Sequence, residues 1–169
     1  GLPDMRAMSL INSKIIPAFM PHEMISKMET TYKYIFKGDK DYLPFMKIKE
    51  IENHMIFQNI KIETFQHNHG SIDAQTYRIE NFAYSTDIKK FYDKDIDKLK
   101  NLDLWIVGLL REDPHPAHAG LEQIMDFVSY IKPKKTLFTH MTALIDEKTL
   151  INKCPPNIRP GYDGMIINL

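Results

Sequence analysis

The stretch Leu102–Leu110 is a nearly continuous apolar run, and it restricts the possible folds more than any other feature of the sequence. A run of this length is typical of a strand that is buried on both faces of a sheet. Residues 119–131 follow with apolar side chains recurring three and four positions apart, which predicts an amphipathic helix. Residues 135–139 form a second apolar strand, so a β-α-β order is expected here.

The segment before Asp87 has a different pattern. Residues 13–20 are extended in character, and residues 22–36 show helical periodicity that Gly38 can end. Strands are expected at 46–49, 55–57, 60–65, 77–80 and 82–86, then helices at 92–99 and 146–152, and a last strand at 165–167. Strands followed by strand–helix alternation predict an α/β fold (α+β by some schemes), with a mixed sheet and flanking helices. No linker or repeat divides residues 1–169, so a single domain is expected.

The composition narrows the classes of function. Lys+Arg and Asp+Glu number 22 each, and this zero net charge argues against nucleic acid or an anionic membrane as a partner. No apolar run approaches the roughly 20 residues of a membrane span, and no signal pattern opens the chain. The one cysteine, Cys154, is read as a reduced thiol. A cytoplasmic protein is expected.

Three polar residues stand at the ends of predicted strands. His69 follows strand 60–65, Asp87 ends strand 82–86, and His140 ends strand 135–139. Ligands bind beyond the carboxyl ends of strands in sheets with helical crossovers, so these side chains are expected to meet. Two imidazoles and a carboxylate suit zinc, iron or manganese, and a carboxylate can bridge two ions. The pattern by itself leaves open that each residue is only a cap or a surface group.

A second group of histidines lies between strand 102–110 and helix 119–131, in the stretch Asp113 to Gly120. His118 stands where the helix is expected to begin, a position that favours phosphate. Its imidazole could donate a hydrogen bond to phosphate or a proton to a leaving alkoxide, although a capping role is the alternative. His115, between two prolines, is interpreted as structural.

These residues lie in stretches that resemble the metallo-β-lactamase superfamily, in the branch of the cyclic phosphate dihydrolases and the RNase Z-like tRNA 3′-processing endonucleases. The matching stretches are Gly1–Arg6, His69-Gly70, Tyr77–Ile79, Phe82–Asp87, Arg111–His118, Pro133–Met141 and Tyr162–Gly164. The resemblance implies the C-terminal portion of an αββα sandwich. It also implies that His69 binds the first metal, Asp87 bridges both, His140 binds the second, and His118 contacts the substrate phosphate.

The family's H-x-H-x-D-H motif would lie before Gly1, and it does not occur in this sequence. Two divalent ions, zinc or manganese, are therefore expected only in the complete enzyme, and residues 1–169 are expected to be inactive or weakly active alone. The opening strands of the sandwich are expected to be missing as well. The sheet edge that their absence exposes favours a homodimer or an N-terminal partner chain.

The resemblance implies a metal-dependent hydrolase, a phosphodiesterase that acts on a small, cyclic phosphodiester. One alternative is a non-catalytic remnant or one half of a split enzyme. A second is an RNase Z-like nucleic-acid phosphodiesterase, which the zero net charge and the lack of a long basic arm disfavour.

Overall fold

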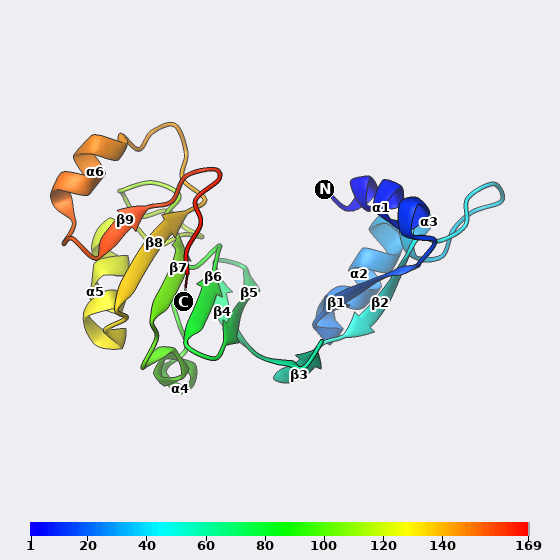
Figure 1. Ribbon diagram of the computed structural model, residues 1–169, viewed down its shortest axis with the longest axis horizontal. Helices are drawn as coiled ribbons and strands as arrows, with labels where there is room; N and C mark the ends of the chain where they lie inside the picture. Colours follow the sequence, from blue (N-terminus) through cyan, green and yellow to red (C-terminus); the bar gives the residue numbers. More distant parts are fainter. Residues whose placement is uncertain (169) are drawn as a thin grey trace. The chain divides into compact units, whose positions relative to one another are not determined.

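The computed structural model describes residues 1–168, and the chain divides into two compact units (Figure 1). The first unit is Gly1–Glu52, and the second begins at Asn53. The interpretation of residues 1–169 as one domain stays a prediction. No helix within residues 1–168 combines the length and apolarity that a membrane crossing requires.

The first unit is a pair of parallel strands with short helices. Its elements are η1 (Leu2–Asp4), α1 (Met5–Asn12), β1 (Ile16–Met20), α2 (His22–Thr31), α3 (Lys33–Phe36) and β2 (Met46–Glu50). Its buried core consists of Ile35, Phe45 and Met46. The prediction of one helix over 22–36 is wrong, because Tyr32 (φ −119°, ψ 41°) separates α2 from α3. β-Branched and aromatic residues at 30–32 are weak helix formers, which accounts for the break.

The second unit contains one seven-stranded mixed sheet. In spatial order its strands are β3 (His54–Phe57), β4 (Ile60–His69), β5 (Ile72–Ile79), β6 (Phe82–Ser85), β7 (Leu104–Gly108), β8 (Lys135–Thr139) and β9 (Ile158–Pro160). Neighbours from β3 to β6 are antiparallel, and those from β6 to β9 are parallel. β4, β6 and β8 therefore run in the same direction and end at the same edge of the sheet.

Helices cover one face of this sheet. They are α4 (Asp93–Ile96), η2 (Asp97–Leu99), α5 (Leu121–Ile131) and α6 (Glu147–Lys153). Ile124 and Ile131 of α5 join Trp105 of β7 and Phe138 of β8 in the main core, on the side where Figure 1 shows α5. This burial confirms the amphipathic pattern that predicted the helix.

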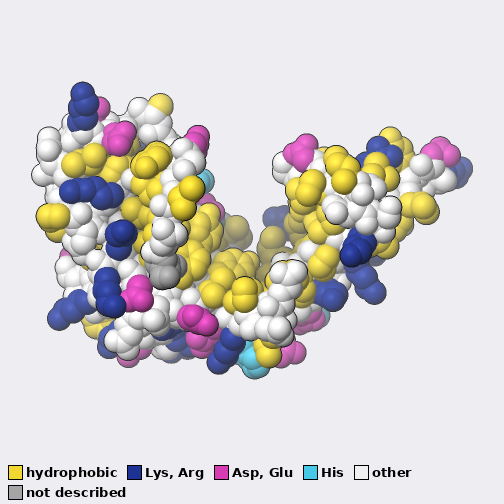
Figure 2. All heavy atoms as spheres, viewed as in Figure 1, with side chains coloured by type: hydrophobic (Ala, Val, Ile, Leu, Met, Phe, Trp, Pro, Cys, Tyr) yellow, Lys and Arg dark blue, Asp and Glu magenta, His cyan; other side chains and the backbone are white. Residues whose placement is uncertain are grey.

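The opposite face of the sheet is apolar and partly open. Tyr84, Ile106 and Leu137 line a groove of about 420 Å³ there, and Figure 2 shows hydrophobic side chains gathered around these strands. Residues 165 and 167 also line the groove, but the prediction of a strand at 165–167 is wrong. The last strand is β9, which pairs with β8 at the edge of the sheet, where the missing N–H of Pro160 is tolerated.

A chain of buried polar side chains crosses the core beneath the strand ends. Trp105 Nε1–H donates to Ser85 Oγ (3.1 Å), which lies 3.0 Å from Thr76 Oγ1. Thr76 Oγ1 is in turn 2.9 Å from His67 Nδ1, and all four residues have 0% exposure. Each polar group thus has a partner, as burial away from water requires.

We expect Ser85→Ala to lower the free energy of unfolding by about 1–3 kcal/mol, because it leaves the buried indole N–H without an acceptor. The measurement is urea unfolding followed by the fluorescence of Trp105, the one tryptophan of the chain. Ser129→Ala is the matched control, since that exposed hydroxyl bonds only to Met125 O within α5, and it should change stability by less than about 0.5 kcal/mol. Equal losses in the two variants would contradict a specific role for Ser85.

Candidate metal centre

The structure brings His69, Asp87, His118 and His140 together at one edge of the sheet. His69 is the last residue of β4, Asp87 lies two residues beyond β6, and His140 directly follows β8. His118 comes from the loop between β7 and α5. Strand β4 extends to His69 rather than ending at 65 as predicted, and this extension carries the imidazole to the shared edge.

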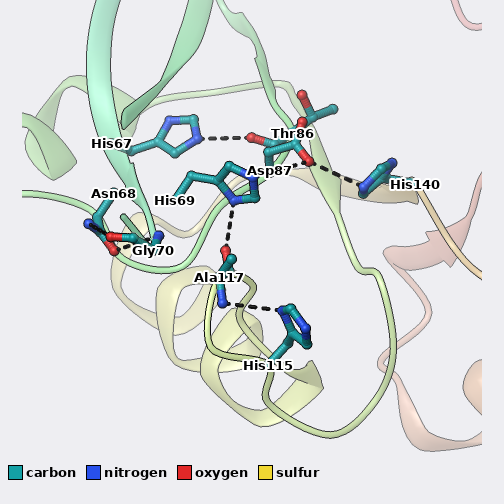
Figure 3. A network of polar contacts seen from close by, with 9 residues as sticks. All are labelled: His67, Asn68, His69, Gly70, Thr86, Asp87, His115, Ala117 and His140. Atoms are coloured by element: carbon teal, nitrogen blue, oxygen red, sulfur yellow. Dashed lines mark hydrogen bonds and ion pairs between the residues drawn. The ribbon is translucent and has the colours of Figure 1, made fainter. Parts of the chain in front are cut away.

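Asp87 lies between two imidazoles. Its Oδ1 is 3.2 Å from His140 Nε2 and 4.0 Å from His69 Nε2 (Figure 3). The three side chains are partly exposed, so an ion and a small ligand could reach them. A carboxylate flanked by imidazole nitrogens matches the donor set of zinc and related divalent ions, so the residues present fit such a group.

His69 has a fixed ring orientation. Its Nδ1–H donates to the carbonyl oxygen of Ala117 at 2.8 Å, which leaves the lone pair of Nε2 on the side of Asp87 (Figure 3). A backbone carbonyl on the far nitrogen is the usual partner of a metal-binding histidine, because it sets the tautomer and raises the basicity of the ligating nitrogen. The contact also ties the end of β4 to the loop that carries His118.

His118 is almost fully buried beside the other imidazoles. Its ring centroid is 4.7 Å from that of His69 and 5.5 Å from that of His140. Burial lowers the pKa of His118, and the neighbouring His69 lowers it further. The side chain is therefore expected to be neutral near pH 7 and able to accept or donate a hydrogen bond.

Several contacts hold the loop that carries His118. Lys89 Nζ donates to His115 O at 2.8 Å, and Ala119 N–H donates to Ile88 O at 2.7 Å. His115 Nδ1 accepts from Ala117 N–H at 3.2 Å, which agrees with the structural role predicted for His115 (Figure 3). Helix α5 begins at Leu121, so His118 lies three residues before the first helical residue instead of standing at the start of the helix.

Asp87 and His140 both have a left-handed backbone conformation. The φ angle is 55° at Asp87 and 60° at His140. Asp and His are among the residue types that tolerate this region, although it costs free energy. Gly108, between them on β7, has no side chain, and a Cβ there would lie 3.3 Å from Asp87 N and 3.6 Å from His140 Cβ. Its small size allows the two neighbouring loops to approach, a role that sequence patterns did not indicate.

His67 was also missed by sequence reasoning. Its Nε2–H donates to the carbonyl oxygen of Thr86 at 2.9 Å, directly before Asp87 (Figure 3). Burial is the main cause that lowers the pKa of His67, so Nδ1 stays unprotonated and can accept from Thr76. His67 thus fixes the backbone that presents Asp87. Its position two residues before His69 was the available signal, since both side chains lie on the same face of β4.

A family model described as the beta-lactamase superfamily domain matches residues 1–141. Among curated proteins, the chain is 27% identical over 171 residues to an octanoyltransferase of Porphyromonas gingivalis (strain ATCC BAA-308 / W83), covering 98% of this chain and 34% of that protein. The chain therefore spans about a third of the length of this relative.

Among solved structures, the chain is similar to a diphosphatase from the PhnP family, with a TM-score of 0.87 and 24% identity. The match covers 98% of this chain and 63% of that one. The metallo-β-lactamase fold protein YhfI from Bacillus subtilis gives a TM-score of 0.72 at 14% identity, with coverage of 96% and 69%. These likenesses show the metallo-β-lactamase fold, as the sequence predicted.

We expect acid to destabilise the metal-free protein partly through His67. Its folded-state pKa is below the ordinary value of 6.5, so the unfolded state binds the proton more readily. The stabilisation is complete above about pH 6.5 and is lost as the pH falls through that value towards the lowered folded-state pKa. His67→Gln removes the titrating group, so its free energy of unfolding should fall less between about pH 7.5 and about pH 5.5. Urea unfolding in chelator measures both proteins, and parallel pH profiles would contradict this role.

Proposed function

Because the chain belongs to the beta-lactamase superfamily domain family, we propose that it contributes the active site of a metal-dependent phosphodiesterase that acts on a small, cyclic phosphodiester. The observation that carries the proposal is the position of the Asp87 carboxylate between His69 and His140. This arrangement suits a carboxylate that bridges two ions. A diphosphatase among the structural neighbours supports phosphorus–oxygen chemistry.

Each of the four side chains has a distinct part in this proposal. His69 would hold the first ion, Asp87 both, and His140 the second. Such ions supply Lewis acidity, which polarises a phosphoryl group and lowers the pKa of water. His118, 4.7 Å from His69 between ring centroids, would donate a hydrogen bond to a phosphate oxygen and a proton to the leaving alkoxide.

The two-ion site needs ligands from outside residues 1–169. A tightly held zinc usually has three or four protein ligands, whereas His69, Asp87 and His140 give each of two ions only two. We expect an H-x-H-x-D-H segment, in the same polypeptide or in a partner chain, to supply the others. The open apolar face around Tyr84, Ile106 and Leu137 offers a surface on which the strands that carry this segment could pack.

The proposed function is tested with a version of the protein extended upstream to include such a segment. It should hydrolyse bis(p-nitrophenyl) phosphate in the presence of Zn²⁺ or Mn²⁺, faster than residues 1–169 alone. His140→Ala should lower kcat/KM by at least about tenfold, because it removes a ligand of the second ion. His54→Ala, on the exposed edge strand β3, is the matched control and should leave the rate unchanged.

Two outcomes would overturn the proposal. Hydrolysis by the extended protein that is no faster than that of its His140→Ala variant would favour the non-catalytic remnant. Salt-sensitive binding of RNA together with cleavage of RNA, but not of the small phosphodiester, would favour the nucleic-acid enzyme instead.

A further inference from the structure

The ligand atoms at the strand ends form a compact triangle that includes His118. One donor atom each from His69, Asp87 and His118 lie within 4.8 Å of one another. We infer that residues 1–169 by themselves hold one zinc-like divalent ion through these three side chains, with His118 as the third ligand as long as no upstream segment supplies one. The inference rests on the proposed function only in taking His69 and Asp87 as metal ligands.

The spacing of the three atoms is close to what one ion requires. Zinc binds nitrogen and oxygen at about 2.0–2.2 Å in tetrahedral geometry, so neighbouring ligand atoms lie about 3.4 Å apart. Atoms no more than 4.8 Å apart reach that separation through small side-chain rotations. Two neutral imidazoles and one carboxylate, with a water in the fourth position, make a donor set of a kind that zinc accepts.

Hydrogen bonds to the backbone fix the His69 ring and the loop that carries His118. His69 is tied to the carbonyl oxygen of Ala117, the residue before His118, so the two imidazoles are linked through one short loop. Lys89 Nζ donates to the carbonyl oxygen of His115, and the Ile88 carbonyl oxygen accepts from Ala119 N–H, so residues 88 and 89 hold the same loop. Because these contacts already order the loop, binding an ion costs little conformational entropy. This low cost raises the affinity for the ion.

His140 is a weaker candidate for the third ligand of this single ion. Its Nε2 approaches Asp87 Oδ1 at 3.2 Å, but its side chain is 42% exposed. It does not belong to the compact triangle that the other three residues form. His118 is 9% exposed, and a less hydrated imidazole gives up less water on binding. We therefore place His140 beside the water in the fourth position and do not count it among the ligands of this ion.

The experiment uses residues 1–169 as they are, stripped of metal and titrated with Zn²⁺ and with Co²⁺ as a spectroscopic probe. Equilibrium dialysis should give one ion per chain, and the Co²⁺ form should show the intense visible bands of four-coordinate geometry. His118→Ala should weaken Zn²⁺ binding by at least about tenfold and change the Co²⁺ spectrum. His140→Ala should change the affinity by much less.

The matched control for His118 is His115→Asn, in the same loop. Asn can accept the hydrogen bond from Ala117 N–H two residues ahead, so this variant keeps the loop and should bind Zn²⁺ like the original protein. Thermal unfolding of the metal-free variants shows whether His118→Ala still folds, and His118→Gln provides a second variant if it does not.

Three results would overturn the inference: no bound ion, two ions per chain, or binding that His140→Ala abolishes while His118→Ala preserves it. None of these results decides the proposed function, which is measured as hydrolysis by the extended protein. Conversely, an inactive extended protein leaves the stoichiometry and the Co²⁺ spectrum of residues 1–169 unaffected.

Discussion

The hydrogen bond from His67 to the Thr86 carbonyl oxygen is the contact on which the site depends most directly. Asp87 follows with a left-handed backbone, a conformation that costs on the order of 1–3 kcal/mol and persists only where the surroundings impose it. His67 holds the preceding carbonyl group from a buried position, and its other nitrogen connects through Thr76 to the core. One hydrogen-bond network therefore links the packing of the sheet to the placement of the Asp87 carboxylate.

Sheet topology accounts for the part of the site that sequence reasoning could find. β4, β6 and β8 run in the same direction, so polar residues at their carboxyl ends arrive at one edge whatever the loops between them do. His69, Asp87 and His140 were predicted from this rule, and the structure brings them together. The apolar run that predicted β7 succeeded for a related reason, since burial on both faces leaves a strong local signal. What each ligand candidate does in the reaction stays a prediction.

The features that sequence reasoning missed depend on contacts between distant residues. His67 is a buried structural histidine and His69 an edge histidine, yet they share a strand face, and only the tertiary packing separates their roles. Gly108 matters because two loops flank it, which no local pattern records. The misplaced last strand has the same origin, because β8 pairs with residues 158–160 although residues 165–167 are the more apolar segment.

His118 lies close enough to His69 and Asp87 to compete with other ligands for an ion. An imidazole whose nitrogen lone pair is bound to a metal no longer serves as the free acid beside a leaving group. The ligand atoms of His69, Asp87 and His118 are up to 4.8 Å apart, so bringing all three to one ion requires side-chain movement. Under the proposed function, an H-x-H-x-D-H segment would supply further ligands, and these would compete with His118 for the ion. Taken together, the two proposals give His118 two roles: it would complete a metal site in residues 1–169 alone, and it would become available to substrate once the segment supplies the remaining ligands.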